Sequence, residues 1–278
     1  MKKINRRSFL AAAGLTAAAL ALTACGGSAS STASSTASSA ASSEAASTSA
    51  AAELTTVEAG KLTMATNAAF PPYEMTTDAG EFEGIDIDTA KAIAEKLGLE
   101  LQIDDMDFDA ALLSVQQDKA DIVMAGVTVT DERKAVMDFS DSYATGIQSI
   151  IVPEGSDITS PDDLAGKKIG TQRGTTGYIY CSDDFGDDAV VAYDDGLTAV
   201  QALNNGQVDA VVIDNAPAKE FVAANPGLVI LDTSYAEEDY AIGLAKGSAL
   251  EDAVNAALEE LKADGTLQSI VDKYITAE

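Results

Sequence analysis

A segment near the middle of the chain combines the groups that bind a carboxylate. An apolar run at residues 122–125 predicts a buried strand that ends at Gly126, where the backbone can approach a ligand closely. Thr130 can cap a short helix that carries Arg133 in its first turn. Such a helix start brings unpaired backbone N–H groups, the Thr128 hydroxyl and the guanidinium together, and each of these groups binds a carboxylate. This segment alone is also compatible with a solvated turn in which Arg133 forms a surface ion pair.

The chain repeats this pattern at a constant offset of 88 residues. Residues 112–121 resemble residues 200–209, and each segment indicates a helix, a polar turn and an aspartate before a hydrophobic strand. At the same offset Gly126 corresponds to Asp214, which follows the second strand. Ligands of open α/β sheets bind at the carboxyl ends of the strands, so Gly126 with Arg133 could bind a carboxylate and Asp214 an ammonium group. Asp214 could also cap the helix that follows it, and the two roles are compatible.

Hydrophobic periodicity predicts an α/β fold with mostly parallel sheets. Up to residue 125 strands and helices alternate, and this order favours parallel strands joined by right-handed crossovers. A rigid loop that carries Phe70 and Tyr73 follows the first strand, because Pro71 and Pro72 exclude a helix or a central strand there. The predicted elements are a strand at 61–66, a helix from Ile87 to Leu97, a strand at 99–104, a helix that begins at Phe108 and a strand at 122–125.

A second α/β lobe is predicted after the extended run at 143–152, which we interpret as the first crossing between lobes. The loop at 172–177 opens a short helix, 178 to about 182, and offers backbone N–H groups to an anion, although such a turn is as often structural only. Residues 240–244 would return to the first lobe. Further strands are predicted at 168–171, 190–193, 210–213 and 229–231, and helices at 249–263 and 267–275.

The first 24 residues are predicted to be a secretion signal rather than part of the fold. Four Lys and Arg residues between positions 2 and 7 precede an apolar run from about Phe9 to Leu22. This run is short and interrupted, which disfavours a permanent membrane-spanning helix. Residues 22–26 resemble a bacterial lipobox, so we expect cleavage before Cys25 and a lipid on its thiol. Residues 5–10 also resemble a twin-arginine export signal, and ordinary secretory export is equally compatible.

Composition separates a linker from the folded part of the chain. Residues 28–53 consist almost entirely of Ser, Ala and Thr and lack the apolar side chains that form a core, which predicts a tether. We therefore expect four parts, which are a signal peptide at 1–24, a lipidated cysteine and linker at 25–53, a first lobe at 54–145 plus 241–278, and a second lobe with hinges at 146–240.

Charge and missing residue types exclude several classes of function. Without the four basic residues of the signal, 13 of 17 Lys and Arg remain against 45 Asp and Glu, a formal charge of −32. This charge disfavours nucleic acid and anionic lipid as partners. The chain has no histidine, which excludes His-based triads and the commonest metal ligand. It has no P-loop, so any ATP chemistry would lie on another chain.

We expect no cofactor, no metal and no catalytic residue. Cys181 is the only cysteine besides Cys25, so no internal disulfide can form.

Five motifs resemble those of polar-amino-acid-binding proteins of bacterial ABC importers. They lie at 65–73, 84–88, 125–133, 138–143 and 174–176, in register between about residues 58 and 275. The resemblance implies a two-lobe periplasmic-binding-protein-like fold of type II, with each lobe a mostly parallel sheet flanked by helices. It also implies capture of a polar amino acid and delivery to an ABC permease with a separate ATPase subunit. We expect a monomer anchored to the cell membrane through Cys25, on the extracellular or periplasmic side.

The resemblance assigns the charged ends of the ligand to five residues. Arg133 would hold the α-carboxylate in a bidentate contact, helped by donors from Thr128 and Thr176. The Gly126 carbonyl and the Asp214 carboxylate would hold the α-ammonium group.

The resemblance assigns the ligand side chain to the first lobe. Phe70 and Phe108 would enclose it, Tyr73 would add a contact, and Asn67 would face its distal polar group. Phe108 could instead be a core residue, and Tyr73 could pack on the neighbouring prolines. Related proteins that bind cationic side chains often have aspartate where this chain has Asn67, which weakens the case for lysine, arginine or histidine. Glutamine, cystine-like and other polar ligands stay open.

We predict that the crossings near 145–148 and 236–240 are hinges. A zwitterion would bind Arg133 first, and the cleft would then close and recruit Asp214 and Thr176. Two other functions are compatible with the pattern. Some dehydratases acting on prephenate-like acids share the bilobed fold, and such an enzyme would need a second cation, for which Arg173 is the candidate. The third possibility is an extracellular amino-acid sensor.

Overall fold

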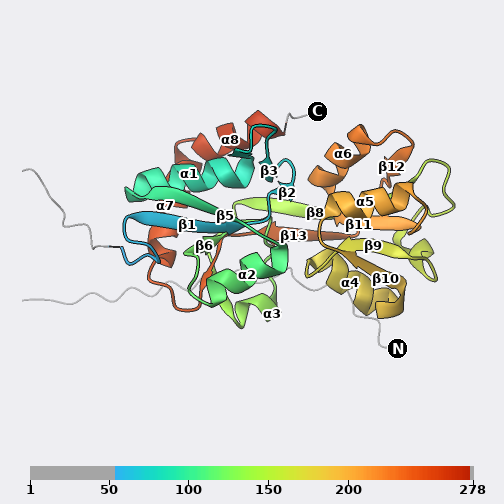
Figure 1. Cartoon of the computed structure of the whole chain (residues 1–278), viewed down its shortest axis with the longest axis horizontal. Helices are drawn as coiled ribbons and strands as arrows, with labels where there is room; N and C mark the ends of the chain where they lie inside the picture. The colour runs from blue at the N-terminus through green and yellow to red at the C-terminus, as the bar shows by residue number, and fades with distance from the viewer. Residues whose placement is uncertain (1–53, 276–278) are drawn as a thin grey trace, which may run out of the picture. The chain divides into compact units, whose positions relative to one another are not determined.

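The computed structural model describes residues 54–275. The predicted signal peptide, lipidated Cys25 and Ser/Ala-rich linker lie outside these residues. The described part contains sheets of five and six strands, each flanked by helices, and a small three-stranded sheet (Figure 1). We call the part around the five-stranded sheet lobe 1 and the part around the six-stranded sheet lobe 2. The predicted α/β class with two lobes is confirmed.

The sheet of lobe 1 follows the predicted alternation of strand and helix. Its strands are β1 (Lys61–Thr66), β5 (Glu100–Asp105), β6 (Ile122–Val123), β7 (Met137–Phe139) and β14 (Gly243–Ala245). They lie in the order β5-β1-β6-β14-β7. β1 pairs in parallel with β5 and β6, whereas β14 returns from the far end of the chain and pairs antiparallel with β6 and β7.

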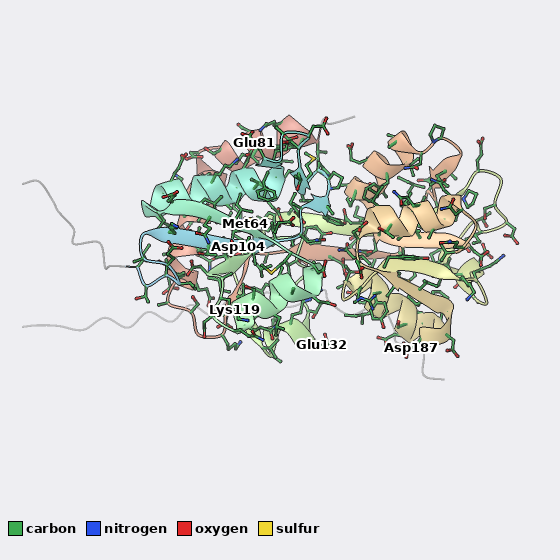
Figure 2. The ribbon with its side chains drawn as sticks, viewed as in Figure 1. Met64, Glu81, Asp104, Lys119, Glu132 and Asp187 are labelled. Carbon is green, nitrogen blue, oxygen red and sulfur yellow. The ribbon has the colours of Figure 1, made fainter. Side chains whose placement is uncertain are left out.

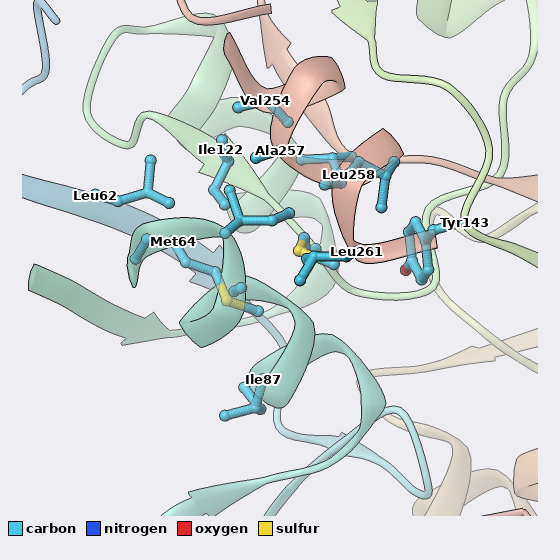
Figure 3. Packing of buried hydrophobic residues seen from close by; sticks show 14 of the residues in the cluster. Leu62, Met64, Ile87, Ile122, Tyr143, Val254, Ala257, Leu258 and Leu261 are labelled. Atoms are coloured by element: carbon cyan, nitrogen blue, oxygen red, sulfur yellow. The ribbon is translucent and has the colours of Figure 1, made fainter. Parts of the chain in front are cut away.

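Helices cover both faces of this sheet because successive strand residues point to opposite sides. Leu62 and Met64 of β1 pack into a core with α1 (Ile85–Leu97), α7 (Glu251–Ala263) and α8 (Thr266–Tyr274). The neighbouring Ala65 faces the other way, toward α2 (Phe108–Gln116). Figure 3 shows the first core, with Leu62, Met64, Ile87, Ile122 and Tyr143 around Val254, Ala257, Leu258 and Leu261. α1 ends where predicted because Gly98 adopts a left-handed conformation, φ 69°, that a glycine accepts readily.

Lobe 2 repeats the arrangement. Neither sheet is mostly parallel as predicted, because half of the strand pairings in lobe 1 and more than half in lobe 2 are antiparallel. Its strands are β8 (Ala144–Pro153), β9 (Ile169–Gln172), β10 (Val190–Tyr193), β11 (Ala210–Asp214), β12 (Leu228–Ile230) and β13 (Ala236–Tyr240). The order is β10-β9-β11-β8-β12, and β13 also pairs with β8. Val211 packs against α5 (Gly196–Asn204) and α6 (Asn215–Ala224), and Val212 packs on the opposite face with α4 (Thr176–Phe185). Cys181 of α4 lies in this second core, where burial raises the pKa of its thiol to about 12.

The two crossings between the lobes form one antiparallel ribbon. β8 and β13 pair from Ala144 opposite Tyr240 to Gln148 opposite Ala236. Residues 240–244 were predicted to return to lobe 1, and the structure divides this segment between the two sheets. Tyr240 ends β13 in the sheet of lobe 2, and Gly243 begins β14 in the sheet of lobe 1.

The remaining elements are short. The segment predicted as a rigid loop after β1 contributes β2 (Ala69–Phe70) to a small sheet with β3 (Glu74–Thr76) and β4 (Phe82–Glu83). The capped turn α3 (Asp131–Lys134) has the predicted cap, since the Thr130 side chain accepts a hydrogen bond from the Arg133 N–H. α4 starts at Thr176, two residues before the predicted start. The 3₁₀ turns are Pro161–Leu164 and Asp187–Ala189.

Charged side chains cover the outside of the described residues. Figure 2 shows Glu81, Lys119, Glu132 and Asp187 on the outside of the ribbon, and all four are exposed. Met64 is fully buried in the core of lobe 1. Within residues 54–275, no helix has the length and apolar character needed to cross a membrane.

Candidate functional site

A cavity is lined by residues of both lobes. Most of the predicted binding residues meet there. Those that line the cavity are Asn67, Phe70, Phe108, Gly126, Thr128 and Arg133 from lobe 1 and Thr176 and Asp214 from lobe 2. The strands β1, β6, β9 and β11 all end at this cavity, as expected for the carboxyl ends of strands in α/β sheets.

Arg133 lies in the wall of the cavity and is only 9% exposed. Its Nη1 donates to the Thr128 carbonyl over 2.9 Å, and its Nη2 donates to the Gly174 carbonyl of lobe 2 over 3.2 Å. The guanidinium carbon lies 5.4 Å from the centre of the Phe108 ring. Burial lowers the pKa of Arg133, while the nearby Glu238 raises it. A buried guanidinium remains charged because arginine cannot be deprotonated in proteins.

A set of polar side chains joins Arg133 to the ribbon between the lobes. The Thr128 hydroxyl lies 3.5 Å from the Thr176 hydroxyl of lobe 2 and donates to Glu238 Oε2 over 3.2 Å. Gln148 Nε2 donates to the same Glu238 oxygen over 3.0 Å. Thr176 is the first residue of α4, where the N–H groups and the helix dipole favour an anion.

Asp214 provides the negative charge on the lobe 2 side. It ends β11, and both of its carboxylate oxygens accept backbone hydrogen bonds: Oδ2 from the Ile147 N–H over 2.8 Å and Oδ1 from the Ala216 N–H over 3.0 Å. The cap that the sequence suggested and the position in the cavity wall are therefore both present. Burial raises the pKa of Asp214 to about 6, although its hydrogen bonds, first that of Tyr240, oppose the rise.

Gly126 lies where a larger side chain would clash with two aromatic rings. Its φ is +54°, and an added Cβ would lie 2.9 Å from the Phe70 ring and 3.2 Å from the Tyr240 ring. Its N–H donates to Asp86 Oδ2 over 3.0 Å. The glycine therefore allows the backbone to approach the aromatic wall of the cavity closely.

Asn67 contacts both lobes. Its Nδ2 donates to the Met106 carbonyl over 2.9 Å, and its Oδ1 accepts a hydrogen bond from Gln172 Nε2 over 2.8 Å. Gln172 belongs to β9 of lobe 2 and also donates to the Asp194 carbonyl over 3.2 Å. The distal part of the cavity is therefore lined by a neutral amide pair.

The aromatic residues divide between the cavity and the core. Phe70 and Phe108 line the cavity. Tyr73, which the sequence predicted as a ligand contact, is placed elsewhere: it is 4% exposed and packs in the core of lobe 1. Its ring stacks on Phe70 at 5.8 Å and meets Tyr240 edge-on at 5.4 Å, so Phe70 lies between it and the cavity.

Eight further cavity residues were not predicted from the sequence, and those with polar side chains are Glu74, Gln148, Gln172, Thr175 and Tyr240. Gln172 could have been found, because it is the first residue of the loop at 172–177 that was already identified as a candidate anion site. Glu74 and Tyr240 carry no local signal of this kind. Their positions depend on the small sheet and on the ribbon of β8 and β13.

The described residues hold no group of three or more Cys, Asp or Glu side chains with the geometry of a metal site. Arg173, the candidate second cation of an enzyme, has a side chain that is 56% exposed and pairs with Asp194 at 3.5 Å. It is not among the residues that line the cavity.

The sequence is similar to that of known binding proteins. Residues 62–277 match the sequence model of bacterial extracellular solute-binding proteins, family 3. A probable histidine-binding protein of Neisseria gonorrhoeae is 32% identical, with 99% of this chain and 98% of the relative covered. The L-cystine-binding protein TcyJ of Escherichia coli K12 is 33% identical, with 80% and 85% covered.

A solved structure shows that the similarity extends to the fold. An ancestral arginine-binding protein bound to glutamine has a TM-score of 0.75 to this chain at 42% identity, covering 78% of this chain and 99% of that one.

Proposed function

This chain belongs to the bacterial extracellular solute-binding proteins of family 3, and we propose that its cavity binds a polar α-amino acid by both charged ends. One observation carries the proposal: Arg133 of lobe 1 and Asp214 of lobe 2 line the same cavity with opposite charges. A zwitterion is the simplest small ligand that complements such a pair. The relatives named for histidine, cystine and arginine are amino-acid-binding proteins, which supports this ligand class.

The α-carboxylate would bind at Arg133. The guanidinium is already directed by its bonds to the Thr128 and Gly174 carbonyls, so little rotamer freedom is lost on binding. The Thr128 hydroxyl and the N-terminal end of α4 at Thr176 lie beside it and offer further donors. The α-ammonium group would bind the Asp214 carboxylate and the Gly126 carbonyl.

The ligand side chain would lie between Phe70 and Phe108 and reach toward Asn67 and Gln172. Hydrogen bonds to charged groups contribute ~1.5–3 kcal/mol each. Four or five such contacts are enough for micromolar affinity, ~8 kcal/mol, after the entropic cost of binding.

We propose that the lobes move about the ribbon of β8 and β13. Lobe 1 would comprise residues 54–145 and 241–278, and lobe 2 residues 146–240. The hinge positions near 145–148 and 236–240 face one another in the ribbon, so a bend in one strand is accompanied by a bend in its partner. Closure would exclude water from Arg133 and Asp214 and strengthen both charged contacts.

The closed form would deliver the amino acid to an ABC permease that works with a separate ATPase subunit. We propose that the protein acts as a monomer, anchored to the cell membrane through a lipid on Cys25 after removal of residues 1–24. The tether at 25–53 would let the folded part reach the permease. An enzymatic role is less well supported, because Arg173 is exposed and lies outside the lining of the cavity.

A ligand screen tests the proposal directly. Purified mature protein is melted with each of the twenty amino acids, cystine and ornithine, and hits are measured by calorimetry. At least one polar L-amino acid should raise the melting temperature, because a ligand that binds only the folded state stabilises it. Absence of any hit, or turnover of prephenate to phenylpyruvate, would reject the proposed function.

A further inference from the structure

Beneath the cavity lies a pair of buried carboxyl groups, Glu74 and Asp86, that has no assigned role. Both residues are 0% exposed. Glu74 begins β3 and forms part of the cavity wall, and Asp86 lies in the first turn of α1. Their side chains are within hydrogen-bonding reach of each other.

The chain packs these two acids together through a glycine. An added Cβ at Gly84 would lie 2.1 Å from the Tyr73 carbonyl oxygen, so only glycine allows the start of α1 to approach the strand that carries Glu74. The Asp86 N–H then donates to the Tyr73 carbonyl over 2.8 Å. The close approach at Gly84 and this backbone hydrogen bond therefore bring the two acids together.

The two acids differ in the hydrogen bonds that they accept. Asp86 Oδ2 accepts hydrogen bonds from the Gly126 N–H over 3.0 Å and the Tyr143 hydroxyl over 2.8 Å. Among the described residues, no donor reaches either oxygen of Glu74 or Oδ1 of Asp86. No lysine or arginine nitrogen of residues 54–275 forms an ion pair with either acid.

Two buried carboxylates in contact and without a cation cannot both be ionised. A proton on Glu74, donated to Asp86, would satisfy the oxygens that otherwise have no partner. Burial, followed by the charge of Asp86, raises the pKa of Glu74 well above its usual value, and burial raises the pKa of Asp86 to about 6. The other titratable groups that face the pair are Tyr73, Asp105 and Tyr143, none of which is cationic.

We propose that Glu74 and Asp86 share one proton and that a ligand with a cationic side chain displaces it, so that Glu74 is a charge-selective element of the cavity wall. A zwitterion with a neutral side chain brings no net charge to the pair, so the shared proton stays in place. A cationic side chain beside Glu74 favours the doubly ionised pair, so the proton leaves to the buffer and the Glu74 carboxylate faces the cation. Glu74 thus supplies the anion that Asn67 does not. This inference rests on the proposed function.

Calorimetry of the mature protein with L-arginine and L-glutamine as probes tests the idea. Each titration is run at pH 7 in phosphate and in Tris, whose ionisation enthalpies differ. Arginine binding should release a proton and therefore show a buffer-dependent enthalpy, and its affinity should rise between pH 6.5 and 8. Glutamine binding should show only the smaller changes that Asp214, whose pKa is about 6, contributes to the binding of both ligands. A buffer-independent enthalpy for arginine would overturn the proposal without any variant being needed.

Glu74→Gln should lower the affinity for arginine relative to glutamine by ~10-fold or more and abolish the proton release. Glu83→Gln, an exposed acid on the neighbouring strand β4, is the matched control and should change neither quantity. An equal change for both probes in Glu74→Gln would mean that Glu74 is only structural and would overturn the proposal. If the wild-type protein binds no amino acid in the screen, the proposed function fails; if it binds both probes without these differences, only the present inference fails.

Discussion

Gln172 Nε2 of lobe 2 donates a hydrogen bond to Asn67 Oδ1 of lobe 1 over 2.8 Å. Together with the bond from Arg133 to the Gly174 carbonyl, it connects the two lobes across the proposed binding site. Each lobe thus contributes to holding the polar groups that would meet the ligand. The first prediction concerns this amide pair.

Gln172→Ala should weaken amino-acid binding by ~1 kcal/mol, the usual net contribution of a hydrogen bond between neutral groups. The loss should appear mainly as faster dissociation, because the substitution removes a bond between lobes rather than a long-range charge. Stopped-flow measurement of ligand release checks this. Gln207→Ala, at an exposed position of lobe 2, serves as the control. A slower or unchanged release rate would contradict the assigned role.

Arg133→Ala should lower the affinity by ~2–5 kcal/mol, because the ligand carboxylate loses its buried cation. Isothermal titration calorimetry with the best ligand of the screen measures the change. Arg173→Ala removes an exposed guanidinium next to the cavity and should leave the affinity within about twofold. Equal effects of the two substitutions would show that Arg133 is not the carboxylate anchor.

Ligand binding should weaken as the pH falls below about 6. Asp214 must be ionised to hold the ammonium group, and burial raises its pKa to about 6. The affinity for a neutral amino acid such as glutamine should therefore rise from pH 5 to 7 and then level off. Asp214→Asn should bind weakly at every pH and lose most of this dependence. A pH-independent wild-type affinity between 5 and 7 would contradict Asp214 as the ammonium partner.

The Asp214 carboxyl group affects the stability of the fold in the opposite direction with pH. Its pKa in the folded protein, about 6, lies above the ordinary value of 3.8, so the folded state binds the proton more tightly than the unfolded chain. Asp214 therefore favours folding below pH 4 and loses that contribution, ~3 kcal/mol, as the pH rises through 6. Urea denaturation of ligand-free protein at pH 4, 5, 6 and 7 should show a flatter pH profile for Asp214→Asn than for the wild type.

Gly146→Ala should destabilise the ribbon between the lobes. An added Cβ at Gly146 would lie 2.5 Å from the Tyr240 ring, and Tyr240 is 1% exposed and packed on Tyr73. We expect a loss of ~1–3 kcal/mol in the free energy of unfolding, the usual range for overpacking. Chemical denaturation measures it, with Val229→Ala on the exposed face of β12 as the control. Wild-type stability of Gly146→Ala would show that the ribbon can shift at little cost.

Local features of the fold were predictable because they depend on a few neighbouring residues. The cap of α3 by Thr130 and the stop of α1 at Gly98 follow from backbone geometry at single positions. The position of Asp214 followed from the internal repeat, which relates the two strand ends without any knowledge of the tertiary structure. The return of residues 240–244 to lobe 1 was predicted, but the change of sheet between Tyr240 and Gly243 was not, since an apolar run does not indicate where a chain leaves one sheet for another.

The sequence by itself therefore determined the α/β class, the two lobes and the residues at the strand ends that can bind a zwitterion. Only the tertiary structure decided that Tyr73 packs in the core while its neighbour Glu74 forms part of the cavity wall. It also placed Gln172 against Asn67 and Glu74 against Asp86. Successive side chains of a strand point to opposite faces of the sheet. Which of the two faces lines the cavity depends on contacts between segments that are distant in the chain. Burial, which sets the charge state of Glu74 and Asp214, is likewise a property of those contacts and not of residue type.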